Sequence, residues 1–426
     1  MNRATAPPLH DDAGWLPIVL VVLAVVFNAG LAIVNAHVMR LSSASVIATE
    51  LLIVAAAYLT IVRHFRPQML PWFAMIAVTV LFAIIRGSIV GQFEPKFMRD
   101  VLLIPTFLLL GLTMSRERLP ALLVVLHVFV IGGVLLEALY TQGYSSLFEV
   151  RAYYIATRAF DDTAFWNTSS DLFVSATRPG ERFFSFVDWH RMSSIFLEPV
   201  SLGNYVVIVT AYLCAEFRHI SRKVFVFLVA GNLLALVACD GRHAAVCSML
   251  LILVSVVAPK LPRVTALGYL PASVLAAVVL AGATNANAFD DNFMGRLAWC
   301  VKVLGKYDVA DWLGMSNTWL VEAYDSGIAY MIATQSFISV ILFWGLVVMG
   351  ARTGRPEQSR YLHALCLYIV LTMLVSYSLF SIKTAALLWV VHGALQRLPE
   401  PAVAAAPRWF RVVQRRATFG RSLRAA

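Results

Sequence analysis

Residues 15–35 read WLPIVLVVLAVVFNAGLAIVN, and none of them is charged. An apolar run of about 20 residues is long enough for a helix that crosses a lipid bilayer. Similar runs recur through the chain of 426 residues, which is 60% hydrophobic and only 14% charged and has a mean hydropathy of +0.77. Soluble domains contain about a quarter charged residues. The composition therefore excludes a soluble enzyme and a disordered scaffold, and it predicts an all-α polytopic protein whose first partner is the lipid bilayer.

We expect twelve membrane-spanning helices in a single transmembrane domain that occupies residues 1–426. The expected spans are 15–35, 43–62, 69–86, 101–115, 119–140, 200–216, 224–239, 243–259, 265–284, 327–350, 361–380 and 382–395. The fourth and the last are short for a simple span, which favours a tilted or re-entrant helix. The first run is too long for the apolar core of a signal peptide and is interpreted as an uncleaved helix.

Basic residues predict the orientation, because Lys and Arg accumulate in cytoplasmic loops. With the N-terminus in the cytoplasm, every inner connection contains at least two Lys or Arg, and residues 396–426 form a basic cytoplasmic tail. Two long loops, 141–199 and 285–326, then lie on the periplasmic side. The net charge of +10 follows from these loop charges, so we do not expect nucleic acid as a partner.

The first long loop is rich in aromatic residues, which make up 14 of the residues between 140 and 200. Aromatic side chains in such a loop form an interfacial belt along short surface helices. They can also line a groove in which sugar rings stack. The two interpretations are compatible, and both remain open.

The first long loop ends in the run DWHRMSSIFLEPVSLGNY, residues 188–205, which contains several polar and ionisable groups. Pro199 suits the first turn of the next helix. Glu198 would then be either a helix cap or a general base. Arg191 precedes Glu198 by about two helical turns, so the two share a face if the run is helical. An arginine that faces a carboxylate suits phosphate binding beside a base, and His190 adjoins this pair.

Further candidate residues lie at the outer ends of other spans. Asp240-Gly241-Arg242-His243 places a cationic pair at the start of a helix, where an anion would offset the added charge. Asp325 lies at the mouth of the tenth span and is either an N-cap or a base. Other ionisable residues at outer helix ends or in apolar spans are Arg86, Arg296, Glu50 and Glu137.

These motifs resemble the bacterial O-antigen polymerase and ligase superfamily, and within it the chain is most similar to exopolysaccharide polymerases of the xanthan type. The resemblance is carried by Arg191-x-x-Ser194-x-Phe196-x-Glu198-Pro199-x-x-x-Gly203-x-Tyr205, by Gly241-Arg242 and by Asp325-Ser326-Gly327. It implies a GT-C-like inner-membrane glycosyltransferase that joins repeat units carried on polyprenyl pyrophosphate at the periplasmic face, without a metal or another cofactor. A flippase and a chain-length-control co-polymerase are the protein partners that it implies.

The resemblance also implies roles for individual residues. Arg191 and Arg242 would hold the pyrophosphate, with His190, His243, Arg86 and Arg296 as further substrate-binding residues, and Glu198 or Asp325 would be the base. The ligase branch uses a histidine in its last large outer loop, and none occurs between Thr284 and Gly327. This departure favours a polymerase over a ligase. A transporter or flippase of lipid-linked oligosaccharides is the alternative from another class, although we find no internal repeat of the kind many transporters contain.

Overall fold

Proline fixes the start of many helices in this chain, because its ring is compatible with the first helical turn and its missing N–H needs no partner there. Pro17, Pro95, Pro120, Pro199 and Pro356 all occupy the first two positions of a helix. The computed structural model describes residues 13–158, 160, 170–177, 182–284, 292–323 and 325–398. These residues form α-helices and short 3-10 helices, and no strand occurs among them.

Eight helices in the described part are long and apolar enough to cross a membrane. They comprise α1 (Leu16–His37), α2 (Ser43–Arg63), α3 (Leu70–Val90), α5 (Leu119–Leu139), α8 (Pro199–Glu216), α9 (Arg222–Cys239), α10 (Arg242–Val257) and α11 (Tyr269–Thr284). Two further helices, α15 (Gly327–Gln335) and α16 (Phe337–Met349), are together long and apolar enough to cross a membrane, but they meet at a bend of 114°, as in a broken span or a re-entrant loop. The protein is therefore a multi-pass α-helical membrane protein.

Helices also occupy the three remaining predicted ranges, but they differ from simple spans. They are α4 (Pro95–Thr113), α17 (Pro356–Met373) and α18 (Ile382–Gln396). The predicted start of α4 at residue 101 is wrong, because the helix begins six residues earlier and includes Arg99 and Asp100 in its first turns. The break at Ser336 inside the tenth predicted span was also not expected, and Ser336 itself caps α16 through its hydroxyl.

The centre of the bundle is formed by α4 and α18, which are almost entirely buried. Glycines bring these two helices together. A Cβ atom at Gly393 in α18 would overlap the Leu108 carbonyl oxygen of α4, and one at Gly111 in α4 would lie 3.0 Å from the Ala394 nitrogen of α18. Small residues at facing positions allow helix backbones to approach closely within a membrane. As a result α18 is shielded from lipid over its whole length.

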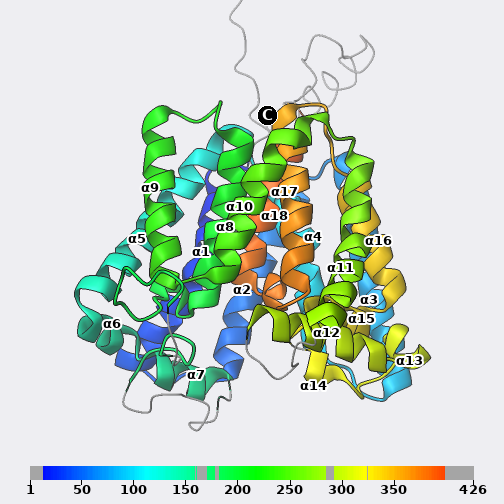
Figure 1. The fold of residues 1–426 in the computed structure, drawn as a ribbon, viewed down its shortest axis with the longest axis horizontal. Coiled ribbons are helices and arrows are strands. Elements are labelled where there is room, and N and C mark those ends of the chain that lie inside the picture. Colours follow the sequence, from blue (N-terminus) through cyan, green and yellow to red (C-terminus); the bar gives the residue numbers. More distant parts are fainter. Residues whose placement is uncertain are drawn as a thin grey trace, which may run out of the picture. The chain divides into compact units, whose positions relative to one another are not determined.

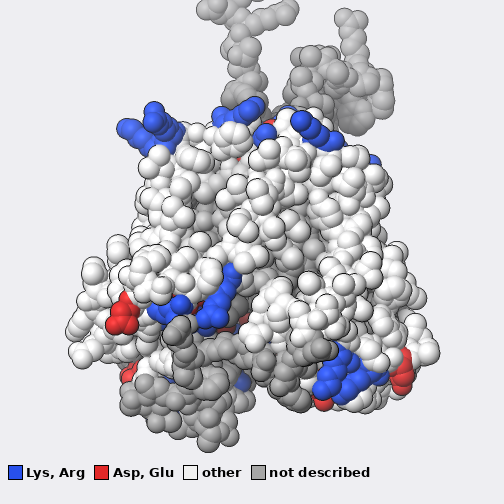
Figure 2. Space-filling view, in the orientation of Figure 1, with Lys and Arg blue, Asp and Glu red and all other residues white. Residues whose placement is uncertain are grey.

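Five short α-helices of the described chain lie at one end of the long helices, the lower end in Figure 1. They are α6 (Thr141–Phe148), α7 (Val150–Arg158), α12 (Phe293–Lys306), α13 (Val309–Trp312) and α14 (Leu320–Ala323). We call this end the loop face. On the side shown in Figure 2, basic side chains gather toward both ends of the helices and leave a nearly uncharged belt between them, as expected for a bilayer-embedded surface.

Candidate functional site

Glu198 lies at the loop face, between a strained turn and the first residue of α8. The run from Arg191 to Glu198 is not an α-helix: Ser194–Phe196 form a 3-10 turn, and Leu197 follows with a positive φ of 63°. A non-glycine residue in this conformation is costly and is often found at functional sites. The condition under which Arg191 and Glu198 would share a helix face is therefore not met. Glu198 is the N-cap residue of α8, but its carboxylate makes no capping hydrogen bond.

The carboxylate of Glu198 is instead paired with Lys383, which lies near the start of α18. The Lys383 ammonium group donates to Glu198 and, over 3.1 Å, to the carbonyl of Phe196, and its side chain is 2% exposed. The hydroxyl of Ser201 donates to the same carboxylate over 2.8 Å. Burial by itself raises the pKa of Glu198, but the Lys383 charge and these two donors outweigh burial and hold the pKa below its usual value. Glu198 is therefore ionised at neutral pH, and its side chain remains 25% exposed.

A second ion pair lies on neighbouring helices. Arg99 in α4 contacts Glu50 of α2 over 2.8 Å and Asp100 over 2.6 Å. Asp100 also accepts a hydrogen bond of 2.7 Å from the Tyr330 hydroxyl of α15. The two carboxylates are buried, whereas the Arg99 side chain is 32% exposed. Arg99 is thus held by its partners in a position from which its guanidinium still reaches solvent.

Arg158, the last residue of α7, completes this group of charges. Its side chain is exposed and makes no hydrogen bond in the described part of the structure, but its charge interacts with Glu50, Glu198 and Lys383. We call Glu50, Arg99, Asp100, Arg158, Glu198 and Lys383 the ionic cluster. It joins three cations and three carboxylates from α2, α4, α7, α8 and α18, and two of its arginines reach solvent. Among the described residues no three His, Cys, Asp or Glu side chains are arranged to hold a metal ion.

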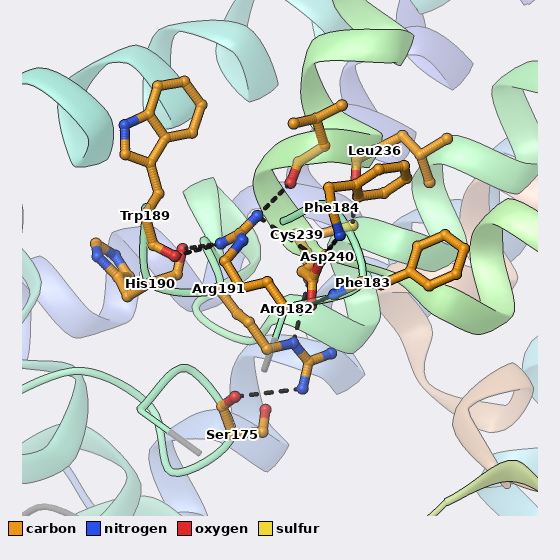
Figure 3. A network of polar contacts seen from close by, with 11 residues as sticks. Ser175, Arg182, Phe183, Phe184, Trp189, His190, Arg191, Leu236, Cys239 and Asp240 are labelled. Atoms are coloured by element: carbon orange, nitrogen blue, oxygen red, sulfur yellow. Dashed lines mark hydrogen bonds and ion pairs between the residues drawn. The ribbon is translucent and has the colours of Figure 1, made fainter. Parts of the chain in front are cut away.

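Arg191 and His190 belong to a different network, which fixes the first long loop to the end of α9 (Figure 3). Arg191 donates to the carbonyls of Cys239 and Ser175, each over 3.3 Å. Asp240 accepts from the backbone N–H groups of Phe183 and Phe184, at 3.1 and 3.0 Å. These contacts hold the first long loop against the end of α9.

Glu137 anchors the same loop from inside the protein. The carboxylate is 0% exposed and accepts hydrogen bonds of 2.8 Å from the backbone N–H groups of Ser193 and Ser194. His190 lies 3.0 Å from its other oxygen. The buried position of this acid at the loop-face end of α5 agrees with its sequence pattern. Its partners show that it holds the turn before Glu198 in place.

The remaining predicted site residues are spread over the loop face. Arg242 begins α10 as expected and is exposed. His243 lies 3.3 Å from the Thr372 hydroxyl and stacks on Phe293. Arg86 is 3% exposed; it donates to Ser316 and Asn317 and lies over the ring of Phe97, so it holds the loop after α13.

Asp325 and Arg296 form a loose pair, with 3.8 Å between the charged atoms and exposed fractions of 68% and 39%. The N-cap interpretation of Asp325 is wrong, because Ser326 is the N-cap of α15 and accepts from the Ala329 N–H. Tyr324, which precedes this pair, lies outside the described residues, as do Asp290 and Asp291 of the second long loop. Of the two candidate bases, only Glu198 belongs to the ionic cluster.

The sequence analysis singled out Glu198 but neither Lys383 nor Arg99 as its companions in the ionic cluster. A charged residue in or beside an apolar run is costly in a membrane unless it pairs with an opposite charge inside the bundle, and this cost was the available signal for Lys383 and Arg99. Arg158 gave no such signal, because it lies in a loop where basic residues are common.

The fold and this site define the class as a multi-pass α-helical membrane protein with an ionic cluster at one end of its helices. No protein-family profile, curated protein or solved structure matches the chain.

Proposed function

We propose that the protein is a glycosyltransferase that joins oligosaccharide repeat units carried on polyprenyl pyrophosphate. The observation that carries the proposal is the ionic cluster, in which the ionised Glu198 pairs with Lys383 and interacts with the charge of the exposed Arg158, while Arg99 of the same cluster also reaches solvent. The proposed topology has twelve crossings in a GT-C-like bundle, with the loop face in the periplasm of a bacterial inner membrane. A lipid carrier suits a site at helix ends, because its tail stays in the bilayer while its head group reaches the cluster.

The proposed orientation rests on the connections at the end opposite the loop face, each of which carries at least two basic residues. These are Arg63 and Arg66, Arg116 and Arg118, Arg218, Arg222 and Lys223, Lys260 and Arg263, and Arg352, Arg355 and Arg360. Both termini are then cytoplasmic.

The proposed reaction breaks the bond between the anomeric carbon of the donor glycan and a pyrophosphate oxygen, and forms a bond from that carbon to an acceptor hydroxyl. Arg158 and Arg99 stabilise the charge that develops on the departing pyrophosphate. Glu198 accepts the hydroxyl proton. Because its pKa is held low by Lys383, Glu198 is a weak base, so most of the rate enhancement comes from orientation and from leaving-group stabilisation.

The test uses purified protein in nanodiscs, a polyprenyl-pyrophosphate oligosaccharide and EDTA, without nucleotide sugars. A product ladder spaced by whole repeat units establishes a polymerase. Glu198→Gln and Arg158→Ala abolish or strongly reduce the ladder, whereas Arg218→Ala, an exposed arginine at the opposite end, leaves it unchanged. An unchanged substrate contradicts the proposal and points to a ligase or a transporter, which liposome flipping and added acceptor lipids then distinguish.

A further inference from the structure

Helix α7 presents two different edges to the rest of the protein. Along one edge, the Tyr153 hydroxyl donates to Asn28 of α1 over 2.7 Å, and the Thr157 hydroxyl donates to the carbonyl of Tyr153 over 2.7 Å. The hydrogen bond to Asn28 fixes the helix to the bundle, and the Thr157 bond lies within α7. Tyr154 and Arg158 define the other edge, and since they are four residues apart they share a face of the helix.

The Tyr154 hydroxyl is a buried donor that has no partner among the described residues. The residue is 4% exposed, and its hydroxyl makes no hydrogen bond in the described structure. Its ring is held by edge and tilted contacts with Tyr153, Phe160 and Phe173, so its position does not depend on the hydroxyl. Most buried polar groups in proteins are hydrogen-bonded, and an unsatisfied one calls for a specific explanation.

The surroundings of this hydroxyl indicate which ligand would satisfy it. The charges that act most strongly on the Tyr154 hydroxyl are those of Glu198 and Arg158. Arg158 likewise makes no hydrogen bond among the described residues. One helix face therefore carries a phenolic O–H and the guanidinium of Arg158, and neither donor has an acceptor among the described residues. Two donors on one helix face suit the non-bridging oxygens of a phosphate group.

We infer that Tyr154 binds the pyrophosphate group of the substrate, and that α7 holds this group through Tyr154 and Arg158 together. The inference rests on the proposed function for the identity of the substrate. In this arrangement α7 binds the pyrophosphate leaving group, and Glu198 accepts the proton of the acceptor hydroxyl. This arrangement also explains the division of the helix: one edge is anchored so that the other can meet a ligand in a fixed geometry.

The neighbouring tyrosines provide a matched test. Tyr154→Phe and Tyr153→Phe each remove one hydroxyl and keep the ring. Without a ligand, Tyr154→Phe leaves the thermal unfolding midpoint unchanged or raises it, because an unpaired buried hydroxyl is lost. Tyr153→Phe lowers the midpoint, because the hydrogen bond to Asn28 is lost.

Binding is measured with inorganic pyrophosphate and with a short-chain prenyl pyrophosphate, by thermal stabilisation and by calorimetry, with sulfate as the control anion. Tyr154→Phe weakens pyrophosphate binding about 10- to 100-fold, as expected for a hydrogen bond to a charged group. Tyr153→Phe retains the wild-type affinity. Equal affinity of Tyr154→Phe and wild type, or no binding to the wild type, overturns the inference.

The polymerisation assay separates this outcome from failure of the proposed function. If the wild type forms no ladder but binds pyrophosphate in a Tyr154-dependent manner, the polymerase proposal fails and the α7 site stands. If the wild type forms a ladder and Tyr154→Phe matches it in rate and affinity, the polymerase proposal stands and the role of Tyr154 is wrong.

Discussion

Two adjacent glycines of α5 give a sharp test of how the turn before Glu198 is held. Gly132 is exposed, and a Cβ atom there would have no atom within 4 Å. At Gly133 a Cβ atom would overlap the Ser194 hydroxyl and lie 3.0 Å from the Ile195 nitrogen. Gly132→Ala and Gly133→Ala therefore make the same chemical change in the same helix and differ only in what the new methyl group meets.

The magnitudes follow from three terms. Alanine in place of glycine stabilises a helix by about 0.5–1 kcal/mol, and this term is common to both variants. At Gly133 the overlap costs about 1–3 kcal/mol, as for other inserted core groups. The displaced Ser194 hydroxyl also loses its 2.6 Å hydrogen bond to the Val130 carbonyl, which costs about 0.5–1.5 kcal/mol. Gly133→Ala should thus be less stable than Gly132→Ala by about 1.5–4.5 kcal/mol.

The assay is denaturant unfolding of the purified variants in mixed micelles, with the free energy of unfolding taken from matched titrations. Gly132→Ala is expected to equal or exceed the wild type in stability, and Gly133→Ala to fall below it. Because the displaced turn carries Glu198, Gly133→Ala should also slow the proposed glycosyl transfer. Equal stability of the two variants would refute the packing argument, since the glycine at 133 would then not be required for the close approach.

Three further predictions concern ion pairs and hydrogen bonds. Arg116 lies 2.9 Å from Glu216 and 2.7 Å from Glu357, so Arg116→Ala removes the nearest cation from two buried carboxylates, leaves Glu357 with His219 at 3.8 Å, and should cost about 3–5 kcal/mol. Arg118→Ala removes a more distant contact, with Trp15 at 5.6 Å, and should change the unfolding free energy by less than about 1 kcal/mol. Tyr330→Phe removes the donor to Asp100 and should lower the unfolding free energy by about 1.5–3 kcal/mol, and an unaltered titration would show that α15 is not tied to α4 in this way. The acidic limit of the proposed activity should lie below pH 4.5, the ordinary pKa of glutamate, because the folded-state pKa of Glu198 is depressed. The stability that Glu198 contributes is present above its unfolded-state pKa and is lost as the pH falls through its folded-state pKa. Lys383→Met removes the charge that depresses this pKa and should move the acidic limit of the pH–rate profile upward, and an unmoved limit would mean that Lys383 does not control Glu198.

The course of the helices could be predicted from apolar runs, because burial in lipid requires them. The expected span at 15–35 corresponds to α1, and that at 119–140 to α5. Where polar residues enter a helix the prediction was less exact: α4 begins at Pro95 because Arg99 and Asp100 are paired within the bundle rather than excluded from it.

The membership of the ionic cluster could not be predicted from spacing along the chain. Glu198 was recognised from its place before Pro199, but its partner Lys383 is 185 residues away in sequence. Arg191 was grouped with Glu198 on the assumption of a helix. The turn at Ser194 and Leu197 separates Arg191 from Glu198, and the Arg191 guanidinium donates instead to the carbonyls of Cys239 and Ser175. Such contacts depend on tertiary packing, which a single sequence does not encode in a local pattern.

The burial of α18 has a consequence for biogenesis. This helix is synthesised after the other described helices, has only 15 residues and contacts protein on every side. A segment so short and so enclosed gains little from lipid, and its stability comes from close packing on α4, where Gly111 faces Gly393 of α18. The earlier helices must therefore assemble around a space that α18 then fills. Because α18 carries Lys383, the charge that partners Glu198 arrives only with this final step, so a nascent chain that stalls before it has neither a closed bundle nor a complete ionic cluster.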